Sequence, residues 1–208
     1  MKILAISQRV ENITQYNEQR DCLDQRWTTL AHSLGFTAVP LSNMASPKDI
    51  INNLKPTAII LSGGNSITKL DPSASDVSPI RDQFEKKLIQ LSIEKNIPLL
   101  GICRGMQFIN MFFSGGLSKL SGHVACRHKV DFVDKTMLLD SREVNSFHSW
   151  GIEKLQLAED LRPFAVAHDK TIEGFYHKSL PIAGIMWHPE REQPFDKNDL
   201  KLFKRFLL

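Results

Sequence analysis

The chain has 208 residues, 42% of them hydrophobic, which is enough for one ordinary domain, and we expect a single domain over residues 1–208. Its formal net charge of +3 without runs of like charge argues against a partner that is a nucleic acid polymer. The three cysteines are widely spaced, which argues against a disulfide framework. No apolar stretch is long enough to span a bilayer, which argues against a membrane partner, so we expect a cytoplasmic location.

Short apolar runs alternate with amphipathic stretches over the first half of the chain. Four of the apolar runs are predicted to be strands, at residues 2–6 (a central strand), 36–39, 57–61 and 97–102. Helices are predicted at residues 21–34, capped by Asp21 and stopped by Gly35, at 46–54, and from Pro79 onward. The polar stretches at residues 8–20 and 65–79 are predicted to be loops. This alternation favours parallel βαβ units and an α/β fold with a mostly parallel sheet.

The second half of the chain is less regular. Apolar runs at residues 130–133 and 136–139 indicate two strands or a hairpin. Further strands are predicted at residues 164–167, 171–176 and 181–186, and Asp196 is predicted to cap a last helix.

Cys103 lies in the run Gly-Ile-Cys-Arg-Gly-Met-Gln, at the point where a predicted strand gives way to a predicted helix. Gly101 and Gly105 permit a tight turn there, which would expose the side chain of Cys103. The helix N-terminus would favour the thiolate, so the pattern predicts a nucleophilic cysteine. The alternative is a buried cysteine at the end of a core strand.

His188 follows another apolar strand, in the run Trp-His-Pro-Glu. In a parallel sheet this strand and the strand before Cys103 would end at the same edge. His188 could then act as the base for Cys103, and Glu190 could orient the imidazole, which together would form a catalytic triad.

Four segments together carry a family resemblance. They are Leu-Ser-Gly-Gly-Asn at 61–65, the Cys103 run, Val-Asn-Ser-Phe-His-Ser-Trp-Gly-Ile at 144–152, and the Trp-His-Pro-Glu run. In this order they resemble the class I glutamine amidotransferase-like superfamily, and more narrowly its γ-glutamyl hydrolase branch. The resemblance implies a flavodoxin-like three-layer α/β sandwich and hydrolysis of a γ-glutamyl amide through a γ-glutamyl thioester.

The resemblance also assigns roles to residues around the thiol. The oxyanion hole would use the amide of Arg104, the residue after the nucleophile, and that of Gly64. Substrate would be held by Gly63, Gln107, His148, Ser149 and Trp150, with the last three acting through their backbone. The alternatives are an ordinary turn at Gly63-Gly64, a surface role for Gln107 and a structural role for His148.

His123, Cys126 and His128 form a His-x-x-Cys-x-His pattern that invites a metal interpretation. No fourth ligand stands at a convincing spacing, so we expect a pocket-wall role, no metal and no cofactor. Seven cations are scattered along the chain: Arg9, Arg20, Arg26, Lys69, Arg81, Arg104 and Arg127. Most are predicted to be solvated, with Arg104 beside the nucleophile as the exception.

Several functions remain open at this point. The resemblance favours release of glutamate from a small γ-glutamyl compound, and it implies a leaving group such as the nucleotide phosphoramidates used in bacterial capsule synthesis. The alternatives are a γ-glutamyl-γ-aminobutyrate hydrolase, the glutaminase component of a two-part amidotransferase, and a binding protein without activity. The oligomeric state, including a homo-oligomer, is left open.

Overall fold

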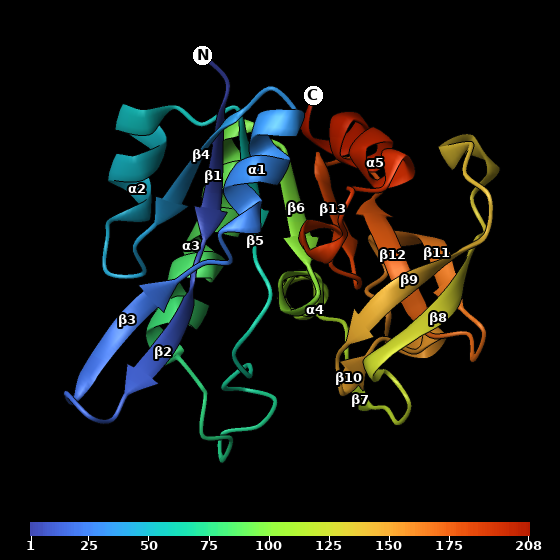
Figure 1. Cartoon of the computed structure of the whole chain (residues 1–208), viewed down its shortest axis with the longest axis horizontal. Helices are drawn as coiled ribbons and strands as arrows, with labels where there is room; N and C mark the ends of the chain where they lie inside the picture. The colour runs from blue at the N-terminus through green and yellow to red at the C-terminus, as the bar shows by residue number, and fades with distance from the viewer.

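A nine-stranded sheet forms the centre of the computed structural model, which describes residues 1–208 (Figure 1). Five strands are parallel: β4 (Thr37–Leu41), β1 (Ile3–Ser7), β5 (Ala58–Leu61), β6 (Leu99–Ile102) and β13 (Ile182–Ile185). Four antiparallel strands continue the sheet: β12 (Ile172–His177), β11 (Leu161–Ala167), β8 (Val124–Phe132) and β9 (Arg142–Phe147). The strand predicted to be central, β1, is second from one edge.

Helices cover both faces of the sheet and make a three-layer α/β fold, as predicted. They are α1 (Arg26–Ser33), α2 (Pro47–Asp49) with the π-helical η1 (Ile50–Leu54), α3 (Pro79–Lys95), α4 (Arg104–Phe112) and α5 (Lys197–Leu207). Short 3₁₀ turns are η2 (Lys135–Met137), η3 (Lys154–Gln156) and η4 (Pro189–Arg191). Trp27 of α1 and Phe203 of α5 share one hydrophobic cluster with Leu4, whereas Phe84 of α3 and Ile109 of α4 share the other with neighbouring Ala5. Alternate residues of one strand thus supply both layers.

The prediction of a loop at residues 8–20 is wrong. This segment is an antiparallel hairpin of β2 (Arg9–Ile13) and β3 (Glu18–Cys22), and it extends away from the main sheet (Figure 1). None of its residues is buried, so the hairpin shows no apolar alternation that sequence analysis could detect. Asn65 holds it to the domain, because its side chain accepts from the Val10 N–H at 2.8 Å and donates to the Val10 carbonyl at 2.9 Å.

Two more element predictions need correction. Asp21 does not cap α1, which begins at Arg26; its carboxylate instead accepts hydrogen bonds from the backbone and side chain of Asn43. Residues 136–139 are not a strand, because the 3₁₀ turn η2 (Lys135–Met137) occupies the start of this run, and the strand before it begins earlier than predicted, at Val124. Arg127, His128, Lys129 and Asp131 interrupt that strand with polar side chains, which hides it from an apolar pattern. Asp196 does cap α5, as predicted.

Two glycines allow α4 to cross closely over the parallel strands. A Cβ on Gly101 would lie 2.5 Å from the carbonyl carbon of Gly105, and a Cβ on Gly105 would collide with the Leu61 carbonyl. Only glycine therefore lets β5, β6 and the start of α4 meet here.

None of the helices is long and apolar enough to cross a membrane.

We expect Gly105→Ala to lower the free energy of unfolding by about 1–3 kcal/mol or more, because the added methyl group overpacks a backbone contact. Urea denaturation of purified protein measures this effect. Gly116→Ala is the matched control, since its Cβ would meet only Gln156 at 3.4 Å. Equal stability of the two variants would contradict the close crossing.

Candidate active site

Cys103 occupies a strained position between β6 and α4. Its φ of 50° and ψ of −105° are unusual for a residue with a side chain, and such strain costs about 1–3 kcal/mol. The Cys103 N–H donates to the Ile185 carbonyl at 2.8 Å and its own carbonyl accepts from the Gln107 N–H at 3.0 Å, so both sides of the turn are tied down. The expected exposure is not found: Cys103 is only 7% exposed.

His188 and Glu190 follow β13, the strand that pairs with β6. Asn145 fixes the backbone of His188, donating to its carbonyl at 2.8 Å and accepting from its N–H at 2.9 Å. The His188 Nδ1 lies 2.7 Å from Glu190 Oε1. Because a carboxylate accepts, Nδ1 carries a proton and Nε2 remains for the thiol. The three side chains that the sequence grouped as a triad therefore lie together.

The electrostatics favour a thiolate beside an imidazolium. Burial alone would raise the pKa of the Cys103 thiol, but the charge and hydrogen bond of His188, helped by His148 and the Arg104 N–H, hold that pKa below its ordinary value. For His188, burial opposes the charge, yet Cys103 and Glu190 raise its pKa to about 9. The proton therefore rests on the imidazole at neutral pH.

Two backbone amides near the thiol are the candidates for the oxyanion hole. The Arg104 N–H contacts the Cys103 sulfur. The carbonyl of Gly63 accepts from the Arg81 guanidinium at 3.2 Å, and in a trans peptide the N–H of the next residue points the opposite way. The Gly64 N–H therefore points away from Arg81, and Gly64 lines a cavity together with Cys103. Gly63 itself packs against His188 and Cys103, leaving no room for a side chain.

Arg81 was predicted to be a solvated cation, and this is wrong. It has no exposed surface, forms an ion pair with Glu85 at 2.8 Å and donates to the carbonyls of Ser62, Gly63 and Gly64. Arg104 lies beside the nucleophile only through its backbone, since its guanidinium pairs with Glu85 and Asp82. One signal was available: Arg81 and Glu85 share a helical stripe with Phe84 and Leu88.

A Peptidase C26 family model matches residues 2–190. The chain belongs to the Peptidase C26 family. The class I glutamine amidotransferase-like assignment made from the four sequence segments is confirmed.

Named relatives fit this family. The chain is 38% identical over 209 residues to "Gamma-glutamyl-CDP-amidate hydrolase" of Campylobacter jejuni, covering 98% of this chain and 96% of the relative. It is 34% identical over 184 residues to a putative glutamine amidotransferase of Schizosaccharomyces pombe, covering 75% and 71%. It is also 30% identical over 166 residues to one component of the glutamine-hydrolyzing GMP synthase of Pyrococcus furiosus, covering 79% and 81%. A solved glutamine amidotransferase from Thermotoga maritima shares the fold, with a TM-score of 0.66, 16% identity and coverage of 100% and 84%.

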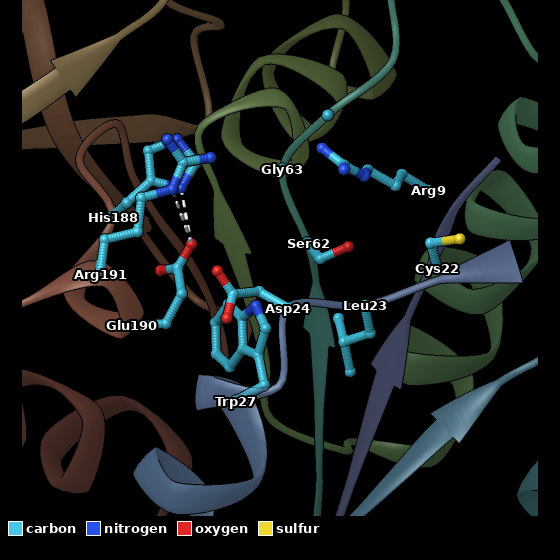
Figure 2. Close-up of a pocket in the computed structure, with 11 residues that line it drawn as sticks. Arg9, Cys22, Leu23, Asp24, Trp27, Ser62, Gly63, His188, Glu190 and Arg191 are labelled. Atoms are coloured by element: carbon cyan, nitrogen blue, oxygen red, sulfur yellow. Dashed lines mark hydrogen bonds and ion pairs between the residues drawn. The ribbon is translucent and has the colours of Figure 1, made fainter. Parts of the chain in front are cut away.

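In this Peptidase C26 protein two cavities flank the thiol and the imidazole. One lies between the hairpin and η4, with Arg9 on one side and Arg191 on the other (Figure 2). The full lining of this hairpin-side cavity is Arg9, Cys22, Leu23, Asp24, Trp27, Ser62, Gly63, Gly64, His188, Glu190 and Arg191. The second, loop-side cavity contains Cys103 and is bounded by the 65–76 loop and residues 147–150. Gly64 lines both cavities.

Four of the five residues expected to hold substrate line the loop-side cavity, whereas the fifth, Gly63, lines the hairpin-side cavity. Gln107, His148, Ser149 and Trp150 all face the loop-side cavity. The Trp150 carbonyl accepts from Gln107 Nε2 at 2.8 Å and lies 3.0 Å from His148 Nδ1, so both side chains position the backbone of β10 (Trp150–Gly151), which pairs with β7 (Ser118–Lys119). His148 is thus structural through its side chain. Ser149 is exposed in the cavity wall.

Cys103→Ser and His188→Ala should each lower the rate of hydrolysis by at least about 10³-fold, the scale of removing a triad member. Steady-state assays of glutamate release measure the loss. Cys126→Ser is the control, because its sulfur lies against the Gly122 carbonyl at 3.1 Å, in the half-exposed start of β8. Near-normal turnover by the Cys103 variant would exclude that thiol as nucleophile.

A second prediction concerns pH. Iodoacetamide should alkylate Cys103 below the ordinary thiol range, because its pKa is lowered, and His188→Ala should move the profile upward. Hydrolysis should fall as pH rises through about 9, where the His188 imidazolium loses the proton needed by the leaving group. A pH–rate profile still rising above that value would contradict the ion pair.

Proposed function

We propose that the protein is a cysteine-dependent γ-glutamyl hydrolase that cleaves a small γ-glutamyl amide and releases glutamate. Cys103 would be the nucleophile, His188 the acid and base, and Glu190 the residue that orients His188. The observation that carries the proposal is the buried thiol beside an imidazole whose other nitrogen is held 2.7 Å from a carboxylate. Membership of the Peptidase C26 family supports the same class of reaction.

The proposed reaction has two halves. The Cys103 thiolate attacks the γ-carbonyl carbon, and the amides of Gly64 and Arg104 receive the oxyanion. The intermediate collapses by breaking the C–N bond, while the imidazolium of His188 protonates the leaving nitrogen and a γ-glutamyl thioester remains. Neutral His188 then takes a proton from water, the hydroxide attacks the thioester carbonyl, and the C–S bond breaks to regenerate the thiolate. No cofactor is needed for either half.

The hairpin-side cavity suits an anionic leaving group. Arg9 and Arg191 face each other across it (Figure 2), and Trp27 provides an apolar surface at its floor. The relative named gamma-glutamyl-CDP-amidate hydrolase supports a nucleotide phosphoramidate, whose phosphates would meet the two guanidinium groups. We infer that the substrate is a γ-glutamyl nucleotide phosphoramidate. Such a substrate agrees with the role in capsule synthesis that the family resemblance implies.

The loop-side cavity suits the glutamyl half. Asp71 and Asp76 give it negative charge for the α-ammonium group, and the backbone of residues 148–150 offers polar groups. The two polar segments of the sequence would therefore have different roles. The hairpin faces the leaving group, whereas the 65–79 loop faces the glutamyl group.

A glutaminase that feeds a separate synthase is the second candidate function. The Pyrococcus furiosus relative is one component of a glutamine-hydrolyzing synthase, and its match covers 79% of this chain. The small loop-side cavity would accept glutamine in the same manner as a γ-glutamyl amide. We further propose that residues 1–208 act as one domain, since one continuous sheet supports both hydrophobic clusters. A cytoplasmic location is proposed from the three widely spaced free cysteines.

A substrate panel tests the function. Purified protein should release glutamate from γ-glutamyl nucleotide phosphoramidates faster than from γ-glutamyl-γ-aminobutyrate or free glutamine. Preferred turnover of free glutamine over every γ-glutamyl compound would instead favour the glutaminase of a two-part amidotransferase.

Variants test the assignment of the hairpin-side cavity. Arg9→Ala and Arg191→Ala should each cost about 10-fold or more in kcat/KM on a nucleotide phosphoramidate, the value of one charge-assisted contact, and less on a neutral γ-glutamyl anilide. Arg20→Ala is the matched control on the same hairpin, since Arg20 pairs with Glu18 and lies outside the cavity. Equal losses on both substrates would place the leaving group elsewhere.

A further inference from the structure

A buried carboxylate gathers three histidines at the end of the antiparallel half of the sheet. Glu173 lies at the start of β12, His128 in β8, His123 just before β8 and His148 just after β9. Pairing between β8 and β11 covers only Val130–Phe132, so the sheet opens here and leaves space for these side chains. All four side chains are at most 6% exposed.

The facing atoms of this cluster have no hydrogen-bond partners. They are Nδ1 of His123, both ring nitrogens of His128, Nε2 of His148 and both carboxylate oxygens of Glu173. From the Glu173 oxygens, His128 Nε2 is 3.3 Å away, His148 Nε2 is 3.5 Å and His123 Nδ1 is 3.9 Å. An uncompensated buried carboxylate is costly, so a positive charge belongs between these atoms.

The outer hydrogen bonds of two histidines fix which nitrogen is free. His148 Nδ1 lies 3.0 Å from the Trp150 carbonyl and His123 Nε2 lies 2.8 Å from Asp169. Both partners can only accept, so these two outer nitrogens carry protons and the opposite nitrogens face Glu173. Either a proton on the facing nitrogens or a metal ion between them can neutralise the carboxylate. A carboxylate or carbonyl behind a ligating histidine is the usual support of a metal site.

We propose that His123, His128, His148 and Glu173 form a closed binding site for a divalent transition metal ion of the zinc type. Zinc bonds to nitrogen and oxygen are about 2.0–2.2 Å long, so neighbouring ligand atoms of a tetrahedron lie roughly 3.3 Å apart. The Glu173 oxygens lie 3.3–3.9 Å from the three facing nitrogens, near this spacing. The ligand atoms of His123, His128 and Glu173 lie within 4.8 Å of one another, so the side chains would draw closer around an ion and His148 would join these three. Imidazole ligands select zinc, cobalt or nickel over magnesium or calcium.

The ligand set differs from the one that the sequence suggested. Cys126 of the His-x-x-Cys-x-His pattern is absent from the cluster, and its sulfur lies against the Gly122 carbonyl. Glu173, which is distant in sequence, takes its place together with His148. Four protein ligands leave no open position, so the ion is structural and lies outside the thiol chemistry. Through His148 it ties the wall of the loop-side cavity to β8 and β12.

Metal titration of the full chain tests this site. After removal of metals by chelation, the protein should bind about one Zn²⁺ or Co²⁺ per chain and should not bind Mg²⁺ in competition. Bound Co²⁺ should give the visible absorption of a four-coordinate ion without a thiolate-to-cobalt charge-transfer band. Zn²⁺ should also raise the melting temperature, because it binds the folded chain. A charge-transfer band, or no stoichiometric binding, would overturn the proposal.

Variants localise the ion by its stoichiometry, independently of activity. Glu173→Gln and His128→Ala should each abolish stoichiometric binding, whereas Cys126→Ser and Cys103→Ser should keep one ion per chain. Retention of the ion in both ligand variants would place it elsewhere and overturn the proposal. If a ligand variant fails to fold, the cobalt spectrum of the unaltered chain still decides between these four ligands and a site that uses cysteine.

Discussion

Arg81 buries a full positive charge between the ends of β1 and β5 and the first turn of α3, with no exposed surface. Glu85 neutralises it, Ser7 donates to Glu85 at 2.7 Å, and Arg104 brings α4 into the same network. Removing one member of such a network would leave a buried charge unpaired, at a cost of about 3–5 kcal/mol. The loop carbonyls that Arg81 holds set the direction of the Gly64 amide. In the proposed reaction, placement of the oxyanion hole would thus depend on a charge with no exposed surface.

Local sequence patterns were sufficient for the parallel half of the fold and for the residues around the thiol. Apolar runs with helical stripes between them marked β5, β6 and α4, and short motifs contained Cys103 and His188. Parallel pairing then brings strand ends to one edge, so two distant motifs meet without any long-range information in the sequence. The hairpin at residues 9–22 could not be found this way, because neither of its faces is buried.

Residues that act through long-range contacts were also missed. Arg81 and Glu85 share a helical stripe with apolar residues, but their charges favoured a solvated position, and only their partners on other elements explain their burial. Glu173 lies alone among apolar strand residues, and its role becomes visible only through the nearby histidines on β8, before β8 and after β9. Its neighbours along the chain offer no signal, since the nearest of these histidines is 25 positions away in the sequence. Sequence patterns detect motifs that are local, whereas buried charge clusters are assembled by topology.

The two cavities share Gly64 in their walls, and this arrangement would fix the order of events in the proposed reaction. After the first half, the glutamyl group stays bonded to sulfur on the loop side, while the hairpin side empties. The second nucleophile must then enter through the space that the departing product has left. A small amine that fits between Arg9 and Arg191 would compete with water there, and the enzyme would transfer the glutamyl group instead of releasing it. The shape of the hairpin-side cavity would therefore set the balance between hydrolase and transferase.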